Sequence, residues 1–112
     1  MIKLIREDIE GIRFCVLQRS ATGRYYTQID WATSLTQAQD YAEEYTDSDM
    51  YQDHEYWAFD TKKWRAYPPT NYSDQKFNSN FPIYHLDNDG KSELLSDYVN
   101  RIVNDATGRW TK

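Results

Sequence analysis

The residues of this sequence best suited to a chemical role are carboxylates, and they gather in one tract that contains no base. No Lys or Arg lies between Arg24 and Lys62, a stretch of 37 residues. This acidic tract holds nine carboxylates: Asp30, Asp40, Glu43, Glu44, Asp47, Asp49, Asp53, Glu55 and Asp60. Its formal charge is −9, whereas the rest of the chain has nine acids and 13 bases and carries +4. Such a separation of charge attracts a basic partner and speeds its association.

Part of the acidic tract has the periodicity of an amphipathic helix that begins near Ser34. Ser34 and Gln37 form a capping-box pair, and Thr36 with Gln39 offers an alternative register. One arc of the helical wheel is apolar and comprises Leu35, Ala38, Ala42 and Tyr45, with Tyr41 at its edge. The opposite arc comprises Asp40, Glu43, Glu44 and Asp47. We expect the apolar arc to be buried and the four carboxylates to face solvent.

The acidic arc of this helix carries electrostatic costs that no neighbouring base relieves. Asp40 and Glu44 are four residues apart, as are Glu43 and Asp47, and each like-charge pair costs about 0.2–0.5 kcal/mol. Asp47 also lies near the negative end of the helix dipole. Such costs are often kept for a binding site, although a solvated face that keeps the protein soluble is the alternative. The predicted partner-binding surface comprises Asp40, Glu43, Glu44, Asp47, Asp49, Tyr51, Asp53 and Glu55.

Two segments place acidic residues at spacings that suggest calcium binding. Residues 47–55 alternate acids with other residues, but they contain no Gly for the sharp turn and no Glu at the closing position. Residues 85–96 place Gly90 correctly, but His85 and Ser96 occupy the first and last ligand positions. Both segments depart from the EF-hand pattern, so we predict no metal site and interpret residues 87–90 as a turn.

No other set of residues has the spacing of a catalytic or cofactor-binding motif. The one Cys and the two His, His54 and His85, do not have zinc-ligand spacing. A Cys15–His nucleophile pair is conceivable, but Cys15 lies in an alternating apolar run and is interpreted as a small buried residue. Four Gly do not form a phosphate-binding loop, and nothing marks two of the carboxylates as a glycosidase-like pair. We therefore expect no enzymatic activity and no cofactor.

A small basic and aromatic patch follows the acidic tract. Lys62, Lys63 and Arg65 flank Trp64, with Tyr67 close by, a combination that single-stranded nucleic-acid sites use. A chain with a pI of 4.9 repels phosphate unless such a patch is well separated from the acids. Direct nucleic-acid binding is therefore disfavoured, and a hairpin tip that exposes its charges is the simpler interpretation.

Alternating apolar residues predict short antiparallel strands before and after the helix that begins near Ser34. Residues 2–6, 12–17 and 24–29 form a meander with a turn at 19–23. Residues 56–59 and 64–67 form a hairpin that Pro68 and Pro69 end, and a long polar loop then leads to a short edge strand at 81–84.

A second amphipathic helix is predicted near the end of the sequence, with a stop at Gly108. Its apolar stripe comprises Leu94, Leu95, Tyr98, Val99, Ile102 and Val103, and Asp97, Arg101 and Asp105 alternate in sign on the outer face. The predicted fold is therefore α+β, with one domain over residues 1–112, an antiparallel sheet of about five strands and two amphipathic helices on one face.

Composition and sequence signals predict a cytoplasmic protein without a membrane partner. One Cys allows no internal disulfide framework and fits a reducing compartment. The N-terminal residues do not resemble a signal peptide, and no apolar run is long enough to span a bilayer.

The function predicted from these features is inhibition by occupancy. A small rigid domain that presents carboxylates and tyrosines can imitate a nucleic-acid backbone and fill a basic groove of a protein partner, as phage anti-CRISPR and anti-restriction proteins do. The likeness is one of composition. An immunity protein against a nuclease toxin, or a phage or mobile-element adaptor that docks through exposed aromatic residues, are the alternatives.

Overall fold

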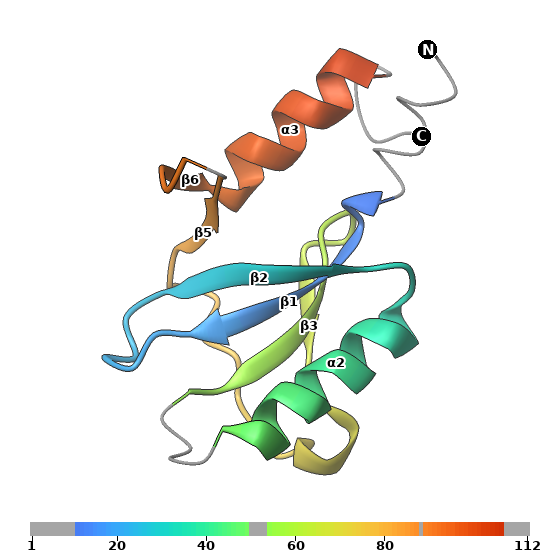
Figure 1. The fold of residues 1–112 in the computed structure, drawn as a ribbon, viewed down its shortest axis with the longest axis vertical. Helices are drawn as coiled ribbons and strands as arrows, with labels where there is room; N and C mark the ends of the chain where they lie inside the picture. Colours follow the sequence, from blue (N-terminus) through green and yellow to red (C-terminus); the bar gives the residue numbers. More distant parts are fainter. Residues whose placement is uncertain (1–10, 50–53, 88, 107–112) are drawn as a thin grey trace.

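The structure is a computed structural model that describes residues 11–49, 54–87 and 89–106, without the side chains of residues 105 and 106 (Figure 1). The predicted strand at residues 2–6, the predicted site residues Tyr51 and Asp53, and the predicted stop at Gly108 lie outside the described residues.

The described chain forms one six-stranded sheet with the order β4-β3-β1-β2-β5-β6. The strands are β1 (Phe14–Arg19), β2 (Tyr26–Ala32), β3 (Tyr56–Asp60), β4 (Arg65–Tyr67), β5 (Ile83–Leu86) and β6 (Ser92–Leu94). All neighbours are antiparallel except β2 and β5, which are parallel. The α+β class is confirmed, but the prediction of about five antiparallel strands is wrong. The chain between β4 and β5 is long enough to cross over the sheet, which lets β5 enter beside β2 in the parallel direction.

Two helices cover opposite faces of this sheet, so the prediction of both helices on one face is wrong. Successive residues of a strand point to opposite faces. Phe14 and Val16 of β1 lie in the clusters packed by α2 (Leu35–Ser48), and Cys15 and Leu17 lie in the cluster that contains the buried residues of α3 (Leu95–Ala106). Because β1 is apolar on both faces, one helix cannot cover it, and a helix packs on each side.

Helix α3 begins one residue later than the apolar stripe predicts, so Leu94 lies outside the helix. Leu94 ends β6 and is 40% exposed, whereas Leu95, Val99 and Val103 are buried. The chain passes directly from β6 into α3. The periodic stripe therefore holds for the helix itself, and its first predicted member belongs to the strand.

The N-terminus of α2 is fixed by the side chains that the capping-box pattern named. Ser34 Oγ accepts a hydrogen bond from Gln37 N at 3.0 Å. Gln37 Oε1 accepts hydrogen bonds from Thr33 N at 2.7 Å and Thr33 Oγ1 at 3.0 Å. The helix thus begins in the Ser34 register, with the reciprocal bond shifted by one residue to Thr33.

Replacement of Ser34 by Ala is expected to lower the free energy of unfolding by about 1 kcal/mol, because a helical N–H loses its acceptor. Urea unfolding measures the change. Thr36→Ala is the matched control, since Thr36 is exposed in the first turn, and we expect a change within about 0.5 kcal/mol. Equal losses in the two variants would contradict the assignment of Ser34 as the cap.

Candidate functional site

The acidic arc predicted for α2 lies on the outer side of the helix. Asp40, Glu44 and Asp47 are exposed, while Ala38 and Ala42 are completely buried against the sheet. Leu35, Tyr41, Tyr45 and Glu43 are half-buried. The predicted exposure of Asp40, Glu44 and Asp47 and the predicted burial of Ala38 and Ala42 are confirmed, whereas Glu43 is less exposed, and Leu35 and Tyr45 less buried, than predicted.

Glu43 and Asp47 are held by a short 3-10 helix, η1 (Thr70–Tyr72), which packs beside α2. Asn71 Nδ2 donates a hydrogen bond to Glu43 Oε2, and Tyr72 Oη donates one to Asp47 Oδ1 at 2.7 Å. The hydrogen bond to the Asp47 carboxylate raises the pKa of the Tyr72 hydroxyl. These donors offset part of the repulsion between the two acids, so the like-charge pair is better tolerated than its spacing alone indicated.

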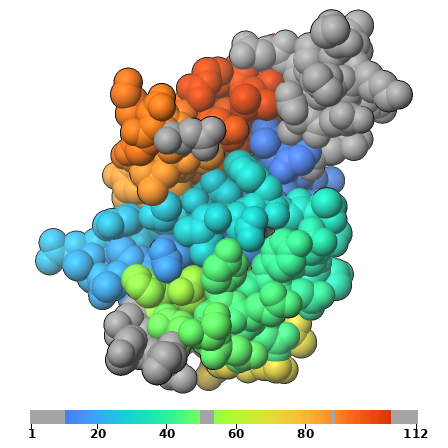
Figure 2. Space-filling model, viewed as in Figure 1, coloured from blue at the N-terminus to red at the C-terminus, as the bar shows by residue number. Residues whose placement is uncertain are grey.

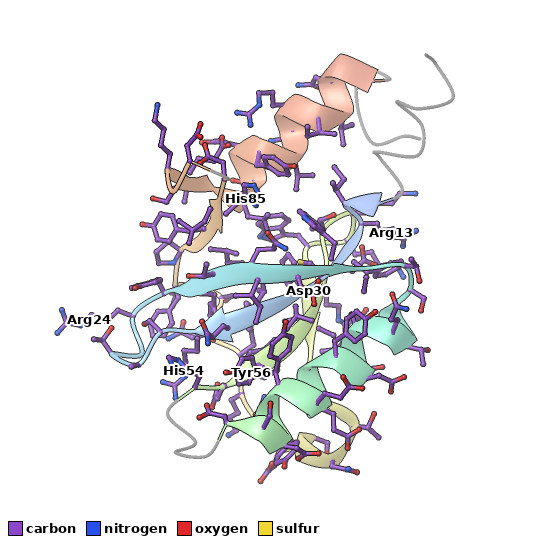
Figure 3. The ribbon with its side chains drawn as sticks, viewed as in Figure 1. Arg13, Arg24, Asp30, His54, Tyr56 and His85 are labelled. Atoms are coloured by element: carbon purple, nitrogen blue, oxygen red, sulfur yellow. The ribbon has the colours of Figure 1, made fainter. Side chains whose placement is uncertain are left out.

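A hollow of about 450 Å³ opens where α2 meets β2. Its lining comprises Asp30, Tyr41, Glu44, Tyr45 and Ser48. Figure 2 shows α2 and β2 as neighbouring strips of one surface, and in Figure 3 Asp30 lies between β2 and α2. The hollow therefore joins a strand carboxylate to the acidic arc of the helix. We call the exposed arc and this hollow together the α2 face.

Tyr45 fixes the inner wall of the hollow. Its hydroxyl donates a hydrogen bond to Asp30 Oδ2 at 3.2 Å, and its ring stacks on Tyr56 with centroids 5.4 Å apart and planes 17° apart. Burial and the nearby Asp30 carboxylate raise the pKa of the Tyr45 hydroxyl. The Tyr45 hydroxyl thus stays neutral, and its hydrogen bond holds the Asp30 carboxylate at the wall of the hollow.

The α2 face offers carboxylate oxygens and aromatic rings to the same small volume. Carboxylates accept charge-assisted hydrogen bonds from guanidinium and ammonium groups, and Tyr rings attract cations over their faces. A basic side chain that entered the hollow would meet Asp30, Glu44 and the rings of Tyr41 and Tyr45. The geometry therefore suits an Arg or Lys of a partner.

Asp30 was counted in the acidic tract but was not predicted as a site residue. It reaches α2 because of a bulge in β2: Val16 pairs with Asp30 and Leu17 pairs with Gln28, which leaves Ile29 as an extra residue. Ile29 packs in the cluster beneath α2, so two successive residues lie on the same side of the sheet. The period-2 pattern of a strand carries no signal of such an insertion.

Two other predicted site residues do not join the α2 face. Asp49 is half-buried, and its Oδ2 accepts a hydrogen bond from His54 N at 3.1 Å. Glu55 Oε1 lies 3.4 Å from Arg19 Nε and accepts a hydrogen bond from Trp57 Nε1 at 3.3 Å. Trp57 belongs to the core on the α3 side of the sheet, so the carboxylate of Glu55 is turned away from α2.

The groups considered for catalysis serve the packing of the sheet. Cys15 is a free, fully buried thiol, and burial raises its pKa, so it stays protonated. His85 Nδ1 lies 2.8 Å from Gln28 Oε1, its ring stacks on Tyr98, and burial lowers its pKa. Among the described residues, no group of three His, Cys, Asp or Glu side chains is placed to hold a metal ion, and no helix is long and apolar enough to cross a bilayer.

No protein family, curated protein or solved structure matches this chain.

Proposed function

We propose that this chain is a binding protein that inhibits a basic partner by occupying its nucleic-acid groove with the α2 face. The observation that carries the proposal is the joint placement of exposed Asp40, Glu44 and Asp47 and a hollow lined by Asp30 and two tyrosines on one side of the sheet. Carboxylates along a rigid helix present negative charge at regular intervals, as a nucleic-acid backbone does.

The hydrogen bonds around the α2 face support this proposal because they hold charged groups in place before any partner arrives. Tyr72 fixes Asp47, Asn71 fixes Glu43, and Tyr45 fixes Asp30. A preordered surface loses less side-chain entropy on binding. The partner would be a nuclease or another nucleic-acid-binding protein, and the same surface chemistry serves an anti-CRISPR, an anti-restriction or an immunity protein.

Docking through exposed aromatic residues is the second candidate, and a specific observation favours it. Trp64 and Tyr25 are 43% and 41% exposed, so both rings are accessible to a partner. They lie on different elements, however, and Tyr25 packs edge-on against Tyr84 with centroids 5.8 Å apart. Partner binding through exposed aromatic rings depends little on ionic strength, whereas charge-driven binding through the α2 face weakens as salt is added.

The test is capture of a partner from host lysate on the immobilised chain, followed by measurements on the purified partner. We expect its affinity for the chain to fall steeply between 0.1 and 1 M NaCl, because the screening length shrinks from about 10 Å to about 3 Å. We also expect the chain to displace nucleic acid from it. A partner that keeps its nucleic acid while bound, or whose affinity is independent of salt, would contradict the proposal.

A further inference from the structure

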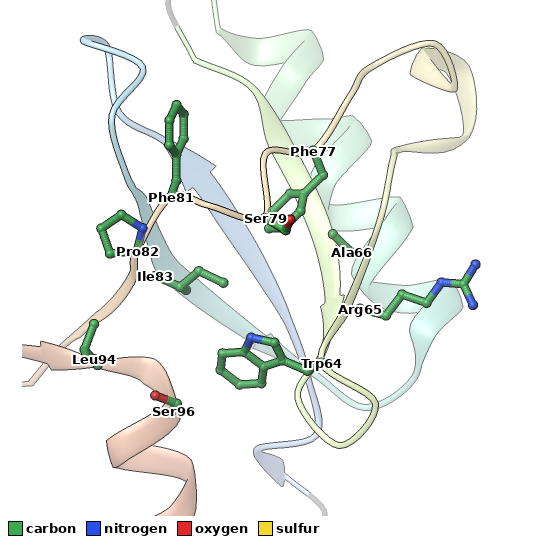
Figure 4. Close-up of a pocket in the computed structure, with 10 residues that line it drawn as sticks. All are labelled: Trp64, Arg65, Ala66, Phe77, Ser79, Phe81, Pro82, Ile83, Leu94 and Ser96. Atoms are coloured by element: carbon green, nitrogen blue, oxygen red, sulfur yellow. The ribbon is translucent and has the colours of Figure 1, made fainter.

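We infer that a second hollow, on the face of the sheet opposite α2, binds an unpaired base of single-stranded nucleic acid. This hollow has a volume of about 430 Å³, within the range of ligand pockets. It lies between Trp64, the loop that leads into β5 and the start of α3 (Figure 4). The residues that define it are Trp64, Phe77, Phe81, Ile83, Leu94 and Ser96. We call it the Trp64 hollow.

The rings of the Trp64 hollow are fixed by packing, and the ring of Trp64 stays 43% exposed to a planar ligand. The indole of Trp64 meets Phe59 edge-on with centroids 4.9 Å apart, and Figure 4 shows it turned into the hollow. Phe77 stacks on Tyr26 with centroids 4.5 Å apart and planes 18° apart. Stacking between a base and such a ring works for every base, since each has an aromatic face.

The backbone of Trp64 is strained, and this strained conformation places its ring in the hollow. Its φ is 54°, in the left-handed region, and it is the one non-Gly residue with positive φ among the described residues. A bulky side chain there costs roughly 1–2 kcal/mol, and glycine is the residue that usually fills such a turn position. Strained residues cluster at binding sites, where the strain is kept for the position of the side chain.

Basic residues favour an anionic ligand at the Trp64 hollow, and one of them, Arg65, belongs to its lining. An exposed lysine directly precedes each of its main rings: Lys63 before Trp64 and Lys76 before Phe77. The nearby Asp60 carboxylate is bound by Arg13 and by the N–H groups of the turn, so its charge is already matched. A partner's aromatic side chain would have no use for these lysines, whereas a nucleotide has both a base and a phosphate.

Acids on the α3 side of the Trp64 hollow restrict where a phosphate can lie. Glu93 is bound by both terminal nitrogens of Arg101, at 2.8 and 2.9 Å, and Asp97 is exposed in the first turn of α3. The phosphate is therefore expected near the basic residues Lys63, Arg65 and Lys76, with the base on the exposed ring of Trp64.

The structure removes the objection that the acidic tract raised against nucleic-acid binding. The ring of Trp64 contacts Phe59, which pairs with Cys15 on the α3 side of the sheet, whereas Asp40, Glu44 and Asp47 lie on the helix of the other side. The sheet separates the two sets of charges, and a strand bound at the Trp64 hollow does not face the α2 acids.

The test is fluorescence anisotropy of a labelled oligo-dT of about ten nucleotides, titrated with the full chain at about 50 and 200 mM NaCl. We expect binding whose salt slope is about −1.4, since each of two lysine–phosphate contacts contributes roughly 0.7. Trp64→Gly removes the ring at a position whose φ suits glycine, so the fold should persist while binding weakens roughly 5- to 150-fold. Trp64→Phe keeps a ring and should lose less.

A matched pair of charge reversals completes the design. Lys63→Glu should weaken binding, whereas Arg24→Glu, at the exposed far tip of the β1–β2 turn (Figure 3), makes the same change in net charge and should not. Circular dichroism confirms the fold of each variant. No binding at the lower salt, an unchanged affinity in Trp64→Gly, or equal losses in the two charge reversals would overturn the inference.

Discussion

The variant that carries Asp40→Lys, Glu44→Lys and Asp47→Lys is expected to fold normally and to lose its basic partner. Each lost pair between desolvated charges costs about 2–5 kcal/mol, so one such pair weakens binding roughly 30-fold and three weaken it more than 10⁴-fold. The association rate should fall as well, because the steering field of the α2 face is reversed. Stopped-flow and equilibrium titrations against the captured partner measure both effects.

The fold should survive this triple change because the three side chains are exposed and lie outside the core. Ala38 and Ala42 carry the packing of α2 and stay in place. A lysine at position 47 forms an attractive pair with Glu43 and suits the negative end of the helix dipole. The hydrogen bond from Tyr72 to Asp47 is lost, but both groups are at the surface.

The matched control replaces Asp74, Asp89 and Asp97 with Lys, three exposed acids outside α2. Both triple variants raise the formal net charge from −5 to +1, because each acid-to-lysine change adds two units. Only the α2 variant should lose the partner. If the two variants bind equally well, the α2 acids merely keep the surface solvated, and docking through aromatic residues becomes the better proposal.

Replacement of Asp60 by Ala is expected to lower the free energy of unfolding by about 3 kcal/mol. The Asp60 side chain is 4% exposed and accepts hydrogen bonds from Arg13 and from the backbone of Lys62 and Lys63. Its loss leaves four N–H donors of Arg13, Lys62 and Lys63 at the end of the sheet without this acceptor. Because Arg13 is 31% exposed, water can solvate part of it, which limits the cost. The urea midpoint should fall by about 1–3 M.

Two variants separate the buried role of Asp60 from a general loss of an ion pair. Asp60→Asn keeps one oxygen for the turn N–H groups but not the charge, so it should cost less than Asp60→Ala. Glu93→Gln removes the charge from an exposed pair with Arg101 and should cost less than about 1 kcal/mol. A loss in Asp60→Ala no larger than that in Glu93→Gln would contradict the assignment of Asp60 as a structural anchor.

The contribution of Asp60 should also depend on pH. Burial alone would raise its pKa, but the hydrogen bonds from Arg13 and from the Lys63 and Lys62 N–H groups outweigh burial and hold the pKa below its ordinary value of 3.8. The carboxylate therefore stabilises the fold above about pH 3.8, and this contribution is lost as the pH falls through the folded-state pKa. The stability difference between the native chain and Asp60→Asn should shrink over that acidic range.

Several elements of this protein follow from the sequence because their causes are local. The Ser34 cap, the apolar arc and the acidic arc of α2 are set within 15 consecutive residues, and the structure shows all three. The hairpin of β3 and β4 is also local, since a short turn joins two apolar runs. The segregation of charge follows from the order of acidic and basic residues along the chain, so the sequence alone reveals it.

Contacts between distant residues decided the rest. The parallel pairing of β2 with β5 depends on how the loop between β4 and β5 crosses the sheet, and loop composition does not specify that path. The two helices lie on opposite faces because β1 is apolar on both sides, a feature that alternation alone does not distinguish from an exposed edge.

The candidate sites show the same division between local and distant causes. The sequence by itself determined that α2 presents carboxylates, because helical periodicity fixes which residues share an arc. The tertiary structure decided that Asp30 joins them, through a bulge that packing stabilises, and that Glu55 is turned away toward Arg19 and Trp57. It also decided that the ring of Trp64 lies on the other side of the sheet, since a residue's face depends on which strands pair and in which register.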